Sequence, residues 1–234
     1  MTVRDGRPDE SRLSSIGQGG APVDDPIREP GLSIPCYSLD LMPKGATQLF
    51  GRTSELKLID DAFFPNILPD TQSKLDAETL KKYCITGAGG VGKSRLAVEF
   101  VSTRKGHFDV ICWLSAASRT KLLDGYKDFA AKLGLISSAR GSEDTIAMNY
   151  VNTWRSRPVR NRNQTQGPFV RWLLVIDNVN KPDDLLLVDD FPHQGRGCVL
   201  VIGRDPSNRT NSRFGPKGHE VEPLAPSEAV DMLL

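Results

Sequence analysis

The sequence predicts an α/β fold built on a doubly wound, mostly parallel sheet, and three observations support this prediction. Continuous apolar runs at 110–114, 172–176 and 198–202 indicate strands buried on both faces, as strands of parallel sheets are. Segments of helical periodicity separate these runs, which is the alternation typical of doubly wound sheets. A fourth apolar segment, 82–86, leads into a glycine-rich loop and then into a helical pattern at 94–101.

The remaining elements follow from local signals. Residues 1–34 are rich in Gly, Pro, Ser, Asp and Arg, so we expect a disordered arm before a domain spanning 35–234. A helix is expected at 54–64, with Thr53 or Ser54 as its N-cap. We further expect a polar connection at 66–80, helices at 121–133, at about 143–154 and after Pro182, a strand at 220–222, and a helix from 227 that the chain end cuts off.

Composition narrows the class of protein. The 30 Lys and Arg residues nearly balance the 29 Asp and Glu residues, which gives no electrostatic case for binding nucleic acid or a membrane surface. Apolar runs of signal-peptide or membrane-helix length are missing from the sequence, so we expect a soluble, cytoplasmic protein. Cys84, Cys112 and Cys198 fall inside predicted strands without C-x-x-C spacing, and we expect buried hydrophobic side chains rather than metal ligands or disulfides.

A cluster of four arginines lies between 155 and 162 without an intervening acid, in a stretch containing Pro and Gln. Such a cluster fits a solvated loop or a site for an anionic partner. The sequence alone does not decide between them.

The most specific motif runs from Gly87 to Ser94 and fits the pattern G-x-x-x-x-G-K-[ST]. Its glycines allow successive N–H groups to converge on phosphate oxygens at the positive end of a helix, which a chance glycine turn would not do. Lys93 is expected to reach the β and γ phosphates, and the Ser94 hydroxyl to ligate Mg²⁺. The predicted phosphate-binding residues are Gly87, Ala88, Gly89, Gly90, Val91, Gly92, Lys93, Ser94 and Arg95.

Asp177 follows the strand at 172–176, at the strand end where open α/β sheets bind ligands. It is a candidate to hold Mg²⁺ together with Ser94, although an Asp in this place can also simply begin a turn. The next residue, Asn178, cannot accept a proton, whereas a fast ATPase needs a base or a water-orienting group there. The pattern therefore favours slow or absent hydrolysis, with an active ATPase or phosphotransferase as the alternative.

Arg204 follows the strand at 198–202. If that strand lies between 82–86 and 172–176, the guanidinium would face the γ-phosphate and distinguish ATP from ADP; otherwise it is a surface arginine. The candidate catalytic residues are thus Lys93, Asp177 and Arg204.

In their order along residues 34–234, these motifs resemble the NB-ARC family of STAND-type P-loop switches, most closely its fungal branch. The resemblance is carried by Ile34 to Ser38, Phe50-Gly51-Arg52, the phosphate loop, Phe108 to Leu114, Trp172 to Asn178, Gly197 to Ile202 with Arg204-Asp205, and Val221 to Leu224. It implies a three-layer P-loop NTPase fold whose five strands, counted from 82–86, have the order 5-1-4-3-2. It also implies that the backbone of Phe50, Gly51 and Arg52 receives adenine.

The functional implication of the resemblance is a switch that binds ADP or ATP with Mg²⁺, resting with ADP and signalling with ATP as a homo-oligomer or with protein partners. Two departures qualify it. Ile202 and Gly203 stand where the family usually has Thr-Thr or Thr-Ser, which is expected to loosen the backbone beside Arg204. The chain also ends at Leu234, before the family's helical bundle, winged-helix domain and repeats. A truncated interaction or remnant protein with weak nucleotide binding is therefore a further alternative.

Overall fold

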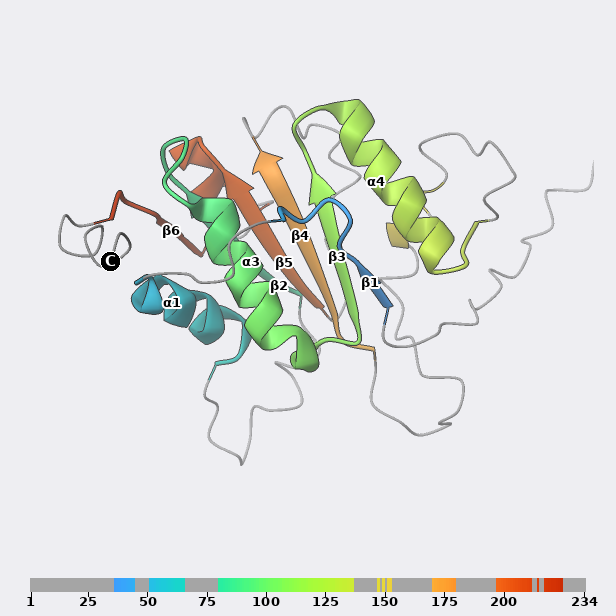
Figure 1. Ribbon diagram of the computed structural model, residues 1–234, viewed down its shortest axis with the longest axis horizontal. Coiled ribbons are helices and arrows are strands. Elements are labelled where there is room, and N and C mark those ends of the chain that lie inside the picture. The colour runs from blue at the N-terminus through green and yellow to red at the C-terminus, as the bar shows by residue number, and fades with distance from the viewer. Residues whose placement is uncertain are drawn as a thin grey trace, which may run out of the picture.

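Six strands of the described residues form a sheet that has helices on both faces (Figure 1). The computed structural model describes residues 36–44, 51–65, 80–136, 147, 149, 151–152, 170–179, 197–211, 214 and 217–224. Its elements are β1 (Cys36–Ser38), α1 (Thr53–Phe63), β2 (Lys81–Thr86), α3 (Lys93–Arg104), η1 (Lys105–His107), β3 (Val110–Ser115), α4 (Arg119–Lys132), β4 (Trp172–Val179), β5 (Gly197–Gly203), η4 (Pro206–Arg209) and β6 (Gly218–Glu220). The predicted α/β class is confirmed.

The strand order is β1-β3-β4-β5-β2-β6, and every pair is parallel. The five predicted strands keep the order 5-1-4-3-2, but the prediction of five strands was one short. The additional strand, β1, adds an edge next to β3, with Cys36 opposite Val110. A three-residue strand is too short to show as an apolar run. The last strand, β6, also lies two residues earlier than the predicted 220–222.

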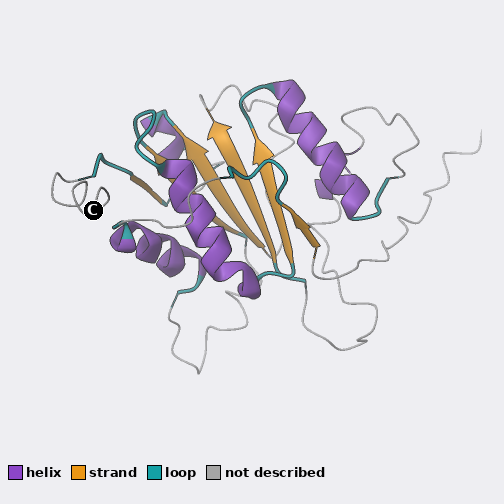
Figure 2. Ribbon diagram, viewed as in Figure 1, coloured by secondary structure: helices purple, strands orange, loops and turns teal. Residues whose placement is uncertain are grey.

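Alternate side chains of the strands enter two separate cores. From β3, Ile111 and Trp113 pack in the core beneath α1 and α3, whereas Cys112 and Leu114 pack in the core beneath α4. Figure 2 shows this three-layer arrangement, with α1 and α3 apart from α4. Burial on both faces explains why the central strands read as unbroken apolar runs.

Helix α1 begins at Thr53, and its cap differs from the prediction. The N-cap residue is Arg52, which has left-handed backbone angles (φ 62°, ψ 16°) and makes no side-chain capping bond. The predicted cap Ser54 lies inside the helix, where its hydroxyl donates to the Glu55 carboxylate at 2.7 Å. The expectation that Thr53 or Ser54 caps this helix was therefore wrong.

Two further predictions concern the cysteines and the membrane. Cys84, Cys112 and Cys198 are buried, none of the four cysteines forms a disulfide, and burial raises the pKa of Cys84 and of Cys198 to about 12. The prediction of buried thiols is confirmed. Within the described part of the chain, the helices are too short or too polar to cross a membrane.

Several predicted segments lie outside the described residues. These are the arm at 1–34, the connection at 66–79, the basic cluster at 155–162, the helix after Pro182 and the helix from 227. Of the predicted helix at 143–154, only 147, 149, 151 and 152 are described, and these positions are helical.

Candidate functional site

The glycine-rich loop joins the end of β2 to the start of α3, which confirms the predicted order of strand, loop and helix. Its backbone depends on left-handed glycine conformations, with φ of 143° at Gly87, 84° at Gly90 and 96° at Gly92. Gly92 is also the N-cap residue of α3. The loop therefore lies at the positive end of a helix, where free N–H groups attract anions.

The start of this loop touches a distant part of the chain. A Cβ on Gly87 would lie 2.5 Å from the carbonyl oxygen of Val221, so a side chain is excluded there by contact as well as by φ. The N–H of Val221 in turn donates to the carbonyl of Thr86 at 2.8 Å. The segment after β6 is thus bonded to the strand end that carries the loop.

Lys93 lies inside the curve of the loop and is only 8% exposed. Its Nζ donates to the carbonyl oxygens of Gly87 (2.8 Å) and Ala88 (2.6 Å). Burial lowers the pKa of Lys93, and the nearby Arg204 lowers it further, while Asp177 acts in the opposite direction. A buried cation with such partners gains strongly from an anion in the adjoining space.

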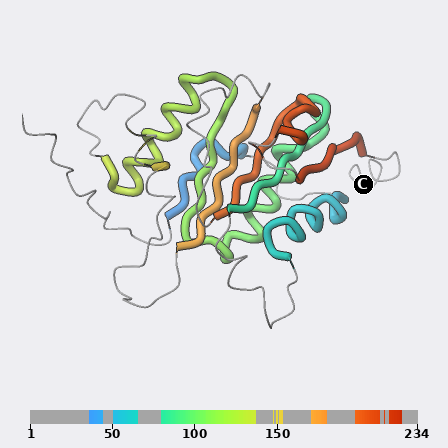
Figure 3. The backbone as a smooth tube through the Cα atoms, turned by 180° about the vertical axis from the view of Figure 1, so that it is seen from behind, coloured from blue at the N-terminus to red at the C-terminus, as the bar shows by residue number. Residues whose placement is uncertain are grey.

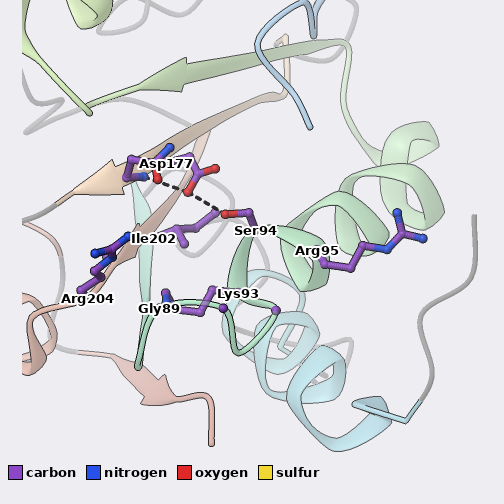
Figure 4. A pocket seen from close by; sticks show the side chains of 11 residues that line it. Gly89, Lys93, Ser94, Arg95, Asp177, Ile202 and Arg204 are labelled. Atoms are coloured by element: carbon purple, nitrogen blue, oxygen red, sulfur yellow. Dashed lines mark hydrogen bonds between the residues drawn. The ribbon is translucent and has the colours of Figure 1, made fainter. Parts of the chain in front are cut away.

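Ser94 and Asp177 meet across the site, as Figure 4 shows. The Ser94 hydroxyl donates to Oδ1 of Asp177 at 3.0 Å, and the backbone N–H of Asn178 donates to the same oxygen at 2.8 Å. Asp177 is 3% exposed, and burial raises its pKa although both hydrogen bonds and Lys93 oppose this shift. A hydroxyl and a carboxylate oxygen this close form a hard donor set, which fits Mg²⁺.

Arg204 follows the central strand β5, which lies between β4 and β2 as its predicted role requires. Its backbone N–H donates to the carbonyl of Val179 at 3.3 Å. Its exposed guanidinium lies beside the loop, with atoms 3.7 to 3.9 Å from the position that a Cβ on Gly89 would take. The structure therefore brings Arg204 together with the phosphate loop.

These groups line one pocket of about 250 Å³ at the carboxyl ends of the central strands. The lining residues are Gly89, Gly90, Gly92, Lys93, Ser94, Arg95, Asp177, Asn178, Ile202, Gly203 and Arg204. Asp177 is the sole carboxylate among these described lining residues. The Arg95 side chain extends away from Lys93, Asp177 and Arg204 in Figure 4. Gly87, Ala88 and Val91 belong to the loop but do not line the pocket.

The segment expected to receive adenine lies beside the loop rather than in this pocket. Phe50 is outside the described residues, and Gly51 and Arg52 both have positive φ, of 65° and 62°. The Arg52 side chain is buried, and it reaches the loop through the carbonyl of Val91 at 3.3 Å. The structure thus brings Arg52 to the loop, with its guanidinium bonded to protein groups.

Sequence reasoning missed one residue beside Arg204. A Cβ on Gly203 would collide with the side-chain nitrogen of Asn208 and would lie 2.6 Å from the carbonyl oxygen of Val179. Asn208 is fully buried, and its Nδ2 donates to that same carbonyl at 3.4 Å. The amide of Asn208 thus fills the space beside Gly203, and a looser backbone at this glycine stays a prediction. A lone Asn after a strand gives no sequence signal of this contact.

Comparisons with known proteins identify the family and a similar fold. The profile of the NB-ARC domain family matches residues 68–234. No curated protein matches the chain. Among solved structures, the fold is similar to that of Cdc6p from Pyrobaculum aerophilum, with a TM-score of 0.54 and 14% identity over 84% of this chain and 51% of that one. The chain spans about half the length of that protein, and the likeness supports the three-layer P-loop NTPase fold.

Proposed function

Since the chain belongs to the NB-ARC family, whose domains are nucleotide-binding signalling modules related to P-loop ATPases, we propose that it is an ADP- and ATP-binding switch. In this proposal it hydrolyses ATP slowly or not at all and signals through its shape. The observation that carries the proposal is the meeting of the phosphate loop, Lys93 and the Ser94–Asp177 pair in one pocket.

Each group has a proposed role that follows from its chemistry. The loop N–H groups and the Lys93 ammonium bind the β and γ phosphates. To do so, Lys93 replaces one of its hydrogen bonds to a loop carbonyl with a hydrogen bond to phosphate. Ser94 and Asp177 would hold Mg²⁺, which neutralises phosphate charge when bound. Arg204 binds the γ-phosphate and so distinguishes ATP from ADP. The backbone at Gly51 and Arg52 receives adenine.

We propose slow hydrolysis because the described residues that line the pocket offer no available group to remove a proton from water. Asn178 lines it with an exposed amide, which cannot remove a proton from an attacking water. The one carboxylate of the described lining, Asp177, is already bonded to Ser94. Two other acids, Asp183 and Asp184, lie outside the described residues.

Two alternatives share the same pocket. An active ATPase would release phosphate from Mg-ATP at several turnovers per second, and a phosphotransferase would form ADP by passing the γ-phosphoryl group to an acceptor; the switch would do neither at such a rate. A remnant protein would bind nucleotide weakly. Assays of phosphate release and of ADP formation at saturating Mg-ATP, together with titrations with ADP, therefore separate these functions.

The central experiment is isothermal titration of ADP with Mg²⁺ into the wild type and Lys93→Ala. Losing the charge-assisted contact should cost about 1.5–3 kcal/mol, or about ten- to a hundredfold in affinity. The control is Lys57→Ala, which removes an exposed lysine of α1. Equal affinities of Lys93→Ala and the wild type would refute the assignment. Mass spectrometry of the purified protein would identify any bound nucleotide.

The proposal extends to assembly and location. We propose that the ATP state self-associates or binds protein partners, and that the protein acts in the cytoplasm, where its four cysteines would stay reduced. Light scattering with ADP and with a non-hydrolysable ATP analogue tests the first part, because only the ATP analogue should raise the mass.

A further inference from the structure

Arg52 joins three parts of the chain that are far apart in sequence. Its Nη1 donates to the Glu55 carboxylate at 2.8 Å within the first turn of α1. Its Nη2 donates both to the carbonyl of Glu222 at 2.7 Å and to the carbonyl of Val91 in the phosphate loop at 3.3 Å. One nitrogen thus bridges the loop and the segment that follows β6. Figure 3 shows β6 next to α1, although the two are distant in the chain.

The same segment contacts the loop at a second point. The carbonyl oxygen of Val221 lies 2.5 Å from the position that a Cβ of Gly87 would take, and the N–H of Val221 donates to the carbonyl of Thr86 at the strand end before the loop. Val221 therefore meets the first residue of the loop, while Glu222 reaches Val91 through Arg52. The phosphate loop is held near both ends by two consecutive residues more than a hundred positions away.

The backbone conformation of Arg52 also indicates that its side chain has a role at this place. Its φ of 62° is a left-handed conformation that costs free energy for any residue with a side chain. Glycine would adopt it without that cost, and the preceding Gly51 does so at 65°. Because Arg52 is held in this conformation and is only 8% exposed, its side-chain contacts must offset the free-energy cost of the backbone.

We propose that Arg52 is a positioning residue that braces the phosphate loop, together with Val221 and Glu222, in the shape that binds phosphate. The inference rests on the proposed function and deepens it, because it assigns the side chain of Arg52 to the loop, beside the proposed contact of its backbone with adenine. A loop already held in its binding shape loses less conformational freedom when phosphate binds. The planar guanidinium reaches Glu55 with one nitrogen and the two carbonyls with another, whereas all the donors of a lysine ammonium share one nitrogen.

The test compares a ligand that has adenine with one that lacks it. Dissociation constants are measured for Mg-ADP, and for Mg-pyrophosphate by competition against a fluorescent ADP analogue, with the full chain. Arg52→Lys keeps the charge, and Arg52→Gly removes the side chain while relieving the backbone, so that at least one variant folds. Glu55→Gln is the matched control, because its amide oxygen still accepts a bond from Arg52 and the two carbonyl bonds are untouched.

If Arg52 braces the loop, its replacement weakens the binding of both ligands, because the defect lies in the loop that binds phosphate. We expect both Arg52 variants to lose about tenfold in affinity for ADP and for pyrophosphate alike, with Glu55→Gln within about twofold of the wild type. Wild-type affinity for pyrophosphate in the Arg52 variants, with or without a loss for ADP, would overturn the inference and leave the proposed function standing. A wild-type protein that binds neither ligand would overturn the proposed function itself.

Discussion

Gly203 offers a sharp test of how the sheet positions Arg204. The family residue at this position usually carries a hydroxyl, so replacing Gly203 with Ala or Thr would look conservative from sequence. The structure indicates instead that either substitution would destabilise the protein. Even a methyl group would collide with the Asn208 side-chain nitrogen and lie 2.6 Å from the carbonyl oxygen of Val179.

The size of the effect follows from which partner can move. An ordinary contact begins at 3.4 Å, so the Val179 oxygen would have to move by about 0.8 Å. That oxygen belongs to the backbone of β4 and accepts the N–H of Arg204, so it resists displacement. Overpacking of this kind costs about 1–3 kcal/mol, and we expect Gly203→Ala to fall near 2 kcal/mol.

A double-mutant cycle with Asn208→Ala separates the two clashes. Asn208→Ala alone should cost about 1 kcal/mol for its lost hydrogen bond, and in its background Gly203→Ala should cost about 1 kcal/mol less than in the wild type. Urea unfolding followed by circular dichroism gives the four free energies of unfolding. A cost for Gly203→Ala below about 0.5 kcal/mol, or additive costs in the double variant, would refute this account of the packing.

Three further outcomes are expected. Asp177→Asn keeps the bonds to Ser94 and to its own backbone neighbour, so the protein should stay folded while ADP binding loses its dependence on Mg²⁺, as titrations with and without EDTA would show. Burial lowers the pKa of His219, whose ring nitrogen pairs with the Tyr83 hydroxyl at 3.0 Å. As pH falls, His219 therefore becomes protonated in the unfolded chain before it does in the folded protein. The free energy of unfolding should thus decrease as pH drops through and below 6.5. His219→Gln should therefore lose less melting temperature than the wild type between pH 7.5 and pH 5.5. Asn178→Asp should raise phosphate release from Mg-ATP, and an unchanged rate would contradict the proposed cause of slow hydrolysis.

The sequence was most informative where a single constraint acts locally. A strand buried on both faces needs an unbroken apolar run, so β3, β4 and β5 were placed to within three residues. The phosphate loop requires glycine and lysine at fixed spacing, and Asp177 follows its strand directly. These features depend on neighbours in the chain, which the sequence displays.

What the sequence could not show depends on contacts between distant segments. Arg52 is the N-cap residue of α1 without a side-chain capping bond, and its side chain reaches Val91 and Glu222, a pairing without any periodic signal. The edge strand β1 exists because β3 offers it a partner, since three residues alone have little strand preference. Asn208 is near Gly203 in the chain, but its fit against that glycine depends on a distant partner, the carbonyl of Val179 in β4.

Asn178 links the backbone geometry of the site to its chemistry, and this makes Asn178→Asp an interpretable variant. Its φ of 64° accompanies a register shift that places Val179 opposite Gly203, so the carbonyl of Val179 can accept the N–H of Arg204. Asn and Asp both tolerate left-handed angles better than other residues with side chains. Asp at 178 should therefore preserve the position of Arg204 while adding a carboxylate, which carries a negative charge and can accept a proton. A residue such as Val would disturb the backbone without adding a proton acceptor, so its effect on phosphate release would say nothing about proton transfer.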